Sequence, residues 1–146
     1  MSIDVTSEIV IRKPLADVAG YTASPDNTAE WSQRIRSVTW INEQPLERGS
    51  RLLFTAELLG RSVSYINEVI ELEPDVRLIM RSSDSPFEME TTYIWTSTSA
   101  STTRMTVRYY AEPAGALGLL SPLLAFLFKQ MIAQDLARLK QLLEDS

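Results

Sequence analysis

The stretch LSPLLAFLFKQMI, residues 120–132, begins the last helix that the sequence predicts, and it decides the fold. A surface helix carries one apolar stripe, whereas here apolar side chains surround the whole circumference. They are Leu120, Leu123, Leu124, Phe126, Leu127, Phe128, Met131 and Ile132. Such a helix has to be covered on all sides. The cover is the curved face of a sheet, a partner chain, a lipid surface or a bulky apolar ligand.

Strand patterns precede this helix and do not alternate with helices. Apolar and polar residues alternate from Ile3 to Ile11, which is typical of a half-buried strand. Turn signals such as Glu73-Pro74-Asp75 separate the later strands, so the connections are short and favour antiparallel pairing. The later strands are expected at residues 38–41, 52–59, 61–72, 76–82, 87–96 and 102–111.

Helices are predicted at both ends of this series of strands. Pro14 begins a short helix over 14–21, and a break at residues 24–27 precedes a second short helix that ends near Ile35. Ser121 is expected as the N-cap of the last helix, which runs over 121–143. The predicted fold class is α+β: a curved antiparallel sheet of about seven strands, two short helices after strand one, and a long C-terminal helix packed across the sheet.

Composition narrows the classes of function. A chain of 146 residues with 45% hydrophobic content is expected to form one domain over residues 1–146. A net charge of -5 and a pI near 4.8 argue against nucleic acid as a partner, because no basic surface is available for phosphates. The first residues, MSIDVTSEIVI, do not resemble a signal or transit peptide. The longest apolar stretch is shorter than the ~18 residues of a membrane-spanning helix, so a cytoplasmic protein is expected.

The chain contains neither histidine nor cysteine. Catalytic triads, an imidazole base, disulfides and histidine- or sulfur-ligated metals are therefore excluded. The five glycines are scattered and form no phosphate-binding loop. We expect no metal and no cofactor, and the sequence identifies no catalytic residue.

The alternation in the later strands assigns two faces to the sheet. One face carries Arg77, Arg81, Glu88, Glu90, Arg104 and Arg108, which is typical of a solvated surface. The other face is aromatic and apolar with a few polar groups, a pattern typical of a small-molecule pocket, although a solid core has the same pattern. The predicted ligand-binding residues are Tyr65, Asn67, Met80, Met89, Thr91, Tyr93, Trp95, Met105, Val107 and Tyr109, with Leu124, Phe128 and Met131 from the last helix. Strand 61–72 must then turn its odd-numbered residues inward.

Several motifs follow one another in a characteristic order. They are EIVIRKPLADVAGYTASPDNTAEW (8–31), Gly49-Ser50-Arg51, NEVIELEPDVRLIMRSS (67–83), TTRMTVRYYAEPAG (102–115) and LLSPLLAFLFKQMIAQDLARLKQLLE (119–144). Together they resemble the START-like (SRPBCC) superfamily with its helix-grip fold, particularly the polyketide cyclase/dehydrase-like branch. Ala19-Gly20 departs from the pattern, because relatives often carry a bulky aromatic residue there.

The resemblance implies a deep apolar cavity between the sheet and the C-terminal helix, holding a lipid, a polyketide or a similar hydrophobic molecule. Our first hypothesis is such a binding protein, with the tyrosines, Asn67 and Thr91 orienting polar ends of the ligand. The second is a cyclase, aromatase or dehydratase in which a buried tyrosine, Glu71 or Glu112 moves protons.

A third hypothesis is an interaction module whose exposed apolar patch meets a second copy of the chain. The patch is expected at Leu117, Leu119, Leu120, Leu123 and Phe126. A membrane is the weaker alternative for this patch, because Lys129 is the one basic residue near it.

Overall fold

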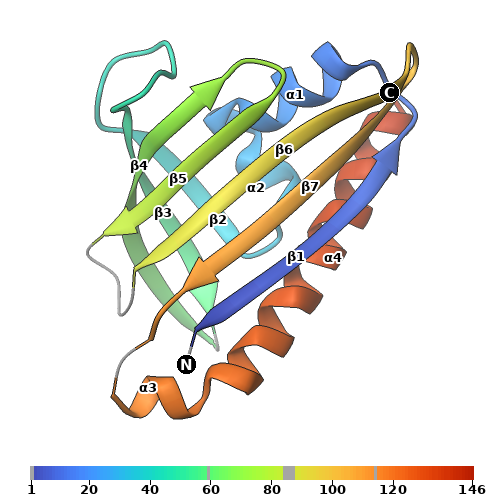
Figure 1. Cartoon of the computed structure of the whole chain (residues 1–146). Helices are drawn as coiled ribbons and strands as arrows, with labels where there is room; N and C mark the ends of the chain where they lie inside the picture. Colours follow the sequence, from blue (N-terminus) through green and yellow to red (C-terminus); the bar gives the residue numbers. More distant parts are fainter. Residues whose placement is uncertain (1, 59, 84–87, 114) are drawn as a thin grey trace.

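One antiparallel sheet forms most of the protein (Figure 1). The structure is a computed structural model that describes residues 2–58, 60–83, 88–113 and 115–146. Its seven strands lie in the order β1-β7-β6-β5-β4-β3-β2. They are β1 (Ile3–Ile11), β2 (Ile35–Trp40), β3 (Arg51–Leu58), β4 (Arg61–Glu73), β5 (Arg77–Ser83), β6 (Met89–Ser99) and β7 (Thr102–Ala111).

Short helical segments follow β1, and the long helix ends the chain. These segments are α1 (Leu15–Ala23), the 3-10 turn η1 (Pro25–Asn27), α2 (Thr28–Trp31), α3 (Ala116–Leu119) and α4 (Ser121–Glu144). The predicted fold class is confirmed: a curved antiparallel sheet is combined with short helices after the first strand and a long C-terminal helix.

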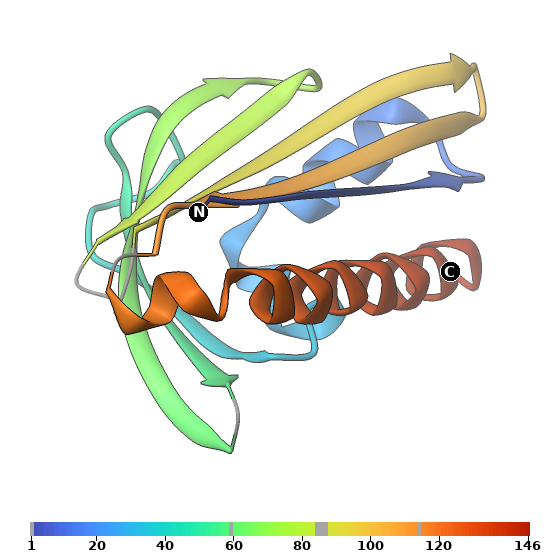
Figure 2. The ribbon, with the colours of Figure 1, turned by 60° about the horizontal axis from the view of Figure 1, so that its bottom comes forward.

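The sheet curves around α4, as Figure 2 shows. A register shift between Val69 and Glu71 interrupts the pairing of the long strand β4 with β5. Such a bulge bends a strand and increases its twist, so β4 can follow the curve. At the start of β3, Gly49 adopts a φ of 92°, a conformation that glycine adopts at little cost, and its N–H binds the carbonyl of Val69 at 2.8 Å.

The helix α4 buries one stripe of its surface against the concave face of the sheet. The stripe consists of Phe128, Ile132, Asp135, Leu136, Leu139 and Leu143, at the three- and four-residue spacing of a helix face. Hydrogen bonds join the C-terminal end of α4 to the end of β1. Glu144 accepts one from the Arg12 backbone N–H at 2.9 Å, and Lys140 donates one to the Val10 carbonyl at 2.7 Å.

The outer face of the sheet carries the expected ion pairs. Arg81 pairs with Glu90 at 3.1 Å, and Arg108 pairs with Asp4 at 2.8 Å. On β4, Tyr65, Asn67 and Val69 turn inward as the binding hypothesis requires, and Asn67 is buried. The inward direction of the odd-numbered residues is thus confirmed as far as Val69. Beyond the register shift it is wrong, because the Glu71 side chain is 44% exposed and pairs with Arg77, whereas Leu72 packs against the core.

Several predicted boundaries are wrong. The second short helix ends at Trp31 and not near Ile35, where β2 already begins, because Ser32 and Gln33 are drawn into hydrogen bonds with Asp135 of α4. Ser121 is the first residue of α4 and not the residue before it. The strand expected over 87–96 continues to Ser99, and Phe87 at its predicted start lies outside the described residues.

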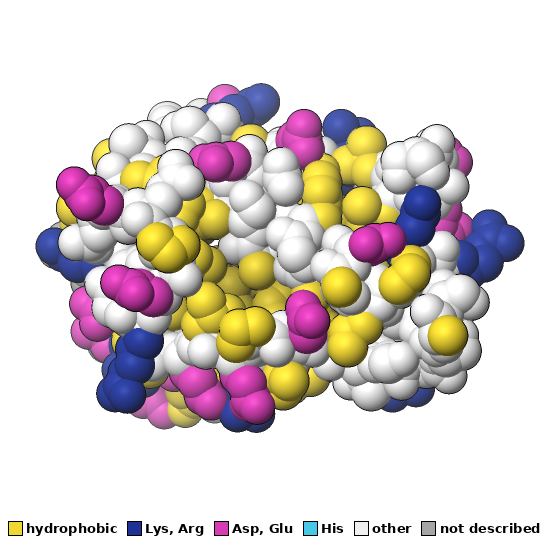
Figure 3. Space-filling model, turned by 90° about the horizontal axis from the view of Figure 1, so that it is seen from above, with side chains coloured by type: hydrophobic (Ala, Val, Ile, Leu, Met, Phe, Trp, Pro, Cys, Tyr) yellow, Lys and Arg dark blue, Asp and Glu magenta, His cyan; other side chains and the backbone are white. Residues whose placement is uncertain are grey.

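The end of the molecule that carries α1 and the β4–β5 turn is hollowed. Figure 3 shows this end with hydrophobic side chains forming the floor of the hollow. It is separate from the cavity beside α4.

Candidate functional site

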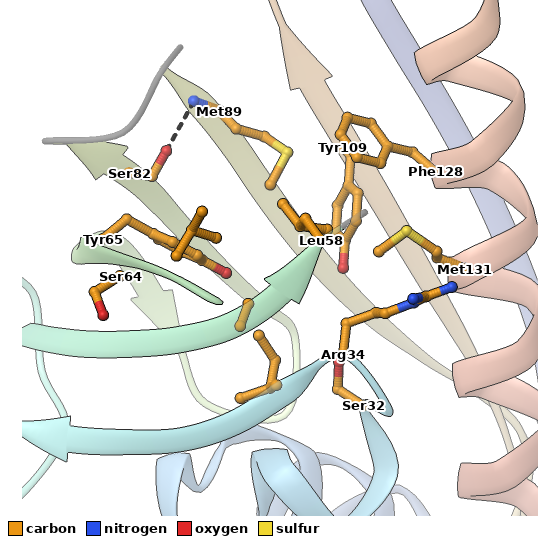
Figure 4. Close-up of a pocket in the computed structure, with 13 residues that line it drawn as sticks. Ser32, Arg34, Leu58, Ser64, Tyr65, Ser82, Met89, Tyr109, Phe128 and Met131 are labelled. Atoms are coloured by element: carbon orange, nitrogen blue, oxygen red, sulfur yellow. Dashed lines mark hydrogen bonds between the residues drawn. The ribbon is translucent and has the colours of Figure 1, made fainter. Parts of the chain in front are cut away.

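A cavity of about 100 Å³ lies between α4 and the strands β2 to β7 (Figure 4). The sheet contributes most of the wall, α4 contributes one side, and the segment between α2 and β2 contributes polar groups. The lining residues are Ser32, Arg34, Ile35, Ala56, Leu58, Val63, Ser64, Tyr65, Ser82, Met89, Tyr109, Phe128 and Met131.

Tyrosines supply the polar groups of the inner face. Figure 4 shows Tyr65 and Tyr109 on opposite sides of the cavity, with both hydroxyls directed into it. Tyr93 lies on the same face and is 6% exposed. None of the three hydroxyls forms a hydrogen bond with a residue that the structure describes. A ligand oxygen in the cavity would accept hydrogen bonds from Tyr65 and Tyr109, which line it, whereas Tyr93 lies outside the lining.

These tyrosines remain protonated at any physiological pH. Burial raises the pKa of Tyr65 to about 12. Burial also raises the pKa of Tyr93, with a smaller contribution from the charge of Asp135. The pKa of Tyr109 is raised well above its ordinary value, again chiefly by burial. Each hydroxyl is therefore a neutral hydrogen-bond donor.

Arg34 brings a cation to the edge of the cavity. Its side chain extends toward Met131 of α4 in Figure 4 and forms no salt bridge with any described residue. Among the serines of the wall, Ser82 accepts a hydrogen bond from the Met89 backbone N–H at 2.9 Å. Phe128 packs edge-on against Tyr109, with ring centroids 6.1 Å apart.

A buried carboxylate lies next to the cavity. Asp135 of α4 is 4% exposed and accepts hydrogen bonds from Ser32 Oγ at 3.1 Å and from the Gln33 backbone N–H at 3.0 Å. Burial raises the pKa of Asp135, whereas these two hydrogen bonds and the charge of Arg34 oppose the rise. Ser32 therefore connects a buried acid to the cavity wall.

Five of the predicted ligand-binding residues line this cavity: Tyr65, Met89, Tyr109, Phe128 and Met131. The others are buried on the same inner face, outside the lining: Asn67, Met80, Thr91, Tyr93, Trp95, Met105 and Val107. Leu124 is half-buried against the core. Alternation places a residue on the inner face but does not show where α4 and α1 fill the space above it. For all of these residues, a role in binding stays a prediction.

Sequence reasoning missed eight lining residues: Ser32, Arg34, Ile35, Ala56, Leu58, Val63, Ser64 and Ser82. The first three were hidden by the assignment of this segment to a helix. Alternation in β3 was a usable signal, since Leu52, Phe54 and Ala56 are all buried. Asp135 was also missed, although its spacing from Ile132 places it on the buried stripe of α4.

The two glutamates considered as proton carriers are placed elsewhere. Glu71 is 44% exposed and pairs with Arg77 at 2.7 Å. Glu112 is exposed and accepts a hydrogen bond from the Tyr110 hydroxyl on the outer face. Neither lines the cavity, whereas Asp135 hydrogen-bonds to Ser32 of the lining.

None of the described helices combines the length and the apolar content needed to cross a membrane. The described residues also contain no group of three or more acidic side chains placed to hold a metal ion.

The sequence matches one family model over residues 2–144, and that family is described as polyketide cyclase / dehydrase and lipid transport. A search of curated proteins found no match. The family match confirms the resemblance that the sequence motifs indicated.

Solved structures share the fold. The Zhui aromatase/cyclase from a Streptomyces species superposes with a TM-score of 0.81 at 13% identity, over 97% of this chain and 93% of that one. TTHA0849 from Thermus thermophilus gives 0.80 at 19% identity, over 94% of both chains. A START superfamily protein from Mycobacterium smegmatis gives 0.72 at 15% identity, over 97% and 94%. At these identities the likeness concerns the fold alone.

Proposed function

The chain belongs to the polyketide cyclase / dehydrase and lipid transport family, and we propose that it binds a hydrophobic small molecule in the cavity beside α4. Family membership supports hydrophobic ligand binding or a cyclase role and does not separate the two. The observation that carries the proposal is the set of tyrosine hydroxyls on an apolar inner face, all protonated and without partners among the described residues. The ligand is therefore an apolar molecule with oxygen acceptors, such as carbonyl groups.

The size of the cavity limits how the ligand enters. About 100 Å³ is less than the volume of the engineered cavity, roughly 150 Å³, that holds benzene in another protein. A lipid or polyketide therefore needs the wall to move. Met89 and Met131 are unbranched and adapt readily to a new shape, and Arg34 is an exposed side chain that can swing outward.

A matched pair of probes tests the proposal. We expect 2-acetylnaphthalene, which carries a carbonyl acceptor, to bind about 2- to 10-fold more tightly than 2-ethylnaphthalene, the range that one net hydrogen bond supplies. Titration calorimetry or fluorescence gives both affinities. Tyr65→Phe and Tyr109→Phe should reduce the difference between the probes. Tyr110→Phe is the matched control, because Tyr110 neighbours Tyr109 in β7 but faces outward.

Two results would refute the proposal. Failure of both probes to bind would exclude the cavity as a hydrophobic site. If the two probes bind with equal affinity, and the tyrosine variants do not change this, the hydroxyls form no hydrogen bond that distinguishes the carbonyl probe.

A cyclase-type enzyme is the second candidate, favoured by the contact between Asp135 and Ser32 at the cavity wall. Burial raises the pKa of Asp135, which makes its carboxylate a stronger proton acceptor. We expect an enzyme of this kind to turn over a poly-ketone, with the rate falling in Asp135→Asn and unchanged in Glu112→Gln. Absence of turnover in the native protein would leave ligand binding as the function.

Self-association is the third candidate, favoured by apolar side chains at the start of α4. Leu119 is 84% exposed and Phe126 is 59% exposed, and Leu120 and Leu123 lie between them in the chain. The side chain of Leu117 lies outside what the structure describes. We propose a second copy of the chain as the partner.

A further inference from the structure

The hollow at the opposite end of the sheet forms a second candidate site. Its volume is about 330 Å³, and it is lined by α1, η1, the loop before β3, the ends of β2 and β4, the β4–β5 turn and Trp95 of β6. Trp40 and Leu72 are half-buried and supply apolar surface, whereas Trp95 is 3% exposed and contributes only a small part of its ring. Along α1 the wall is made by small residues, and a Cβ at Gly20 would meet no atom within 4 Å. The volume is within the range of small-molecule pockets.

An aromatic partition separates this hollow from the cavity beside α4. The ring centroids of Trp31 and Tyr93 are 5.7 Å apart, and those of Tyr93 and Trp95 are 6.3 Å apart. Trp95 lines the hollow and its indole N–H donates to Thr22 Oγ1 at 2.8 Å, which fixes the ring. Among the residues that the structure describes, none lines both spaces. The two sites can therefore hold different ligands.

The charge of the hollow is negative. Asp26 and Asp75 line it, and none of its described lining residues is Lys or Arg. Asp26 accepts one hydrogen bond, from Trp40 Nε1 at 3.0 Å, which also positions that indole. Asp75 forms no side-chain hydrogen bond or salt bridge with a described residue. Arg77 is two residues further along the chain, but its guanidinium already pairs with Glu71 and Glu73.

We propose that this hollow binds an organic cation: a small molecule that carries a protonated or quaternary amine on an apolar body. An indole attracts a cation through its face, and Trp40 is the half-buried indole of the lining, while the exposed carboxylates of Asp26 and Asp75 supply an opposite charge. The apolar floor, visible in Figure 3 with acidic side chains around the hollow, takes the body of the ligand. An anionic ligand would meet two carboxylates and no compensating cation in the wall.

The experiment compares benzyltrimethylammonium with 2-methyl-1-phenyl-2-propanol, a neutral molecule of similar shape. The protein has three tryptophans, so the indole N–H signals of ¹⁵N-labelled protein report the place of binding. We expect the cation to shift the signals of Trp40 and Trp95 and to bind at least about threefold more tightly than the alcohol. Phenylacetate, the anion, should bind more weakly than either.

Substitutions separate the charge from the shape of the site. Asp26→Asn keeps the acceptor for Trp40 and removes the charge, and Asp75→Asn suits the φ of 63° because asparagine tolerates that conformation. Each change should weaken binding of the cation about threefold or more. Asp17→Asn, an exposed acid of α1 outside the lining, is the control with the same change in net charge and should leave the affinity unchanged.

Three outcomes would overturn the proposal: no binding of the cation at millimolar concentration, equal affinity for the alcohol, or equal weakening by Asp17→Asn. Tyr65→Phe and Tyr109→Phe should have no effect on this site. Failure of the cation site and failure of the hydrophobic cavity are thereby distinguished.

Discussion

Asp135 is the most unusual single residue of the protein, because a carboxylate on the buried stripe of a helix has lost most of its water. Its pKa is raised, chiefly by burial, so the folded state holds a proton there more tightly than the unfolded state does. The ionised form therefore costs stability. That cost is absent at low pH and appears as the pH rises through the folded pKa.

We expect Asp135→Asn to be at least as stable as the native protein at pH 7. Asparagine resembles the protonated acid, keeps an acceptor for the Gln33 N–H, and carries no buried charge. The gain should shrink as the pH is lowered toward 4. Chemical unfolding of both proteins between pH 4 and pH 7 measures it. Greatest destabilisation of the variant at neutral pH would show that the two charge-assisted hydrogen bonds outweigh the burial of the charge.

Phe128 shows how a cavity changes the cost of truncation. A fully packed phenylalanine loses about 3–5 kcal/mol on replacement by alanine, but Phe128 faces the cavity on one side and has fewer contacts to lose. We expect Phe128→Ala to lower the free energy of unfolding by less than about 3 kcal/mol and to increase binding of 2-acetylnaphthalene.

The control for Phe128 is Leu136→Ala on the same stripe, where the side chain is buried away from the cavity. This change should cost about 2–5 kcal/mol without any gain in binding. A cost near 5 kcal/mol for Phe128→Ala, with no added binding, would mean that the helix packs there as in an ordinary core.

At the scale of the element, the C-terminal end of α4 depends on Glu144. Its carboxylate accepts hydrogen bonds from Lys140 Nζ at 2.6 Å and from the Arg12 backbone N–H at 2.9 Å. These contacts, that with Lys140 first, lower the pKa of Glu144 to about 2. Stability from this group is present above about pH 4.5, its ordinary value, and is lost as the pH falls toward 2.

We expect Glu144→Gln to destabilise the protein at pH 7 and to unfold with a weaker dependence on pH between 4.5 and 2 than the native protein. Thermal unfolding across this range is the measurement. Glu43→Gln, an exposed change of equal charge in the loop before β3, is the control. Parallel pH curves for native and Glu144→Gln proteins would show that the end of α4 is held by its apolar contacts alone.

Most elements could be predicted because their patterns are local. Alternation fixed both faces of β6 and β7, and the apolar run after Pro122 indicated α4. The segment from Ser32 to Ile35 could not be predicted, because its conformation depends on Asp135, about a hundred residues away in the chain. A long-range hydrogen bond has no signature in the local sequence.

At the scale of the molecule, local patterns predict which residues lie on the inner face of the sheet, but they do not predict where the cavity lies. Met105 and Val107 were correctly placed on that face, yet they lie in packed core. Arg34 lines the cavity although its segment was predicted to be part of a short helix. The position of empty space is set by how α1, α2 and α4 fill the curve of the sheet. The position of the cavity therefore depends on many packing contacts between elements, and the alternation within a single strand gives no information about them.

The exposed apolar side chains around the start of α4 bear on the oligomeric state of the protein. Four large apolar side chains are exposed from the end of α3 to the first turns of α4: Leu119, Leu120, Leu123 and Phe126. A large exposed apolar patch is one of the features that mark protein–protein interfaces. We expect a dimer in native mass spectrometry at tens of micromolar, and a monomer for Phe126→Asp, because a carboxylate in the interface would be desolvated.

Ile41→Asp is the control for Phe126→Asp, since Ile41 is also exposed but lies in the loop after β2, away from α4. This change should leave the dimer intact. A native protein that is monomeric at tens of micromolar would remove the interface. A dimer that persists in Phe126→Asp would place the contact elsewhere, and the edges of the sheet at β1 and β2 would be the next candidates, because each has one side without a neighbouring strand among the described residues.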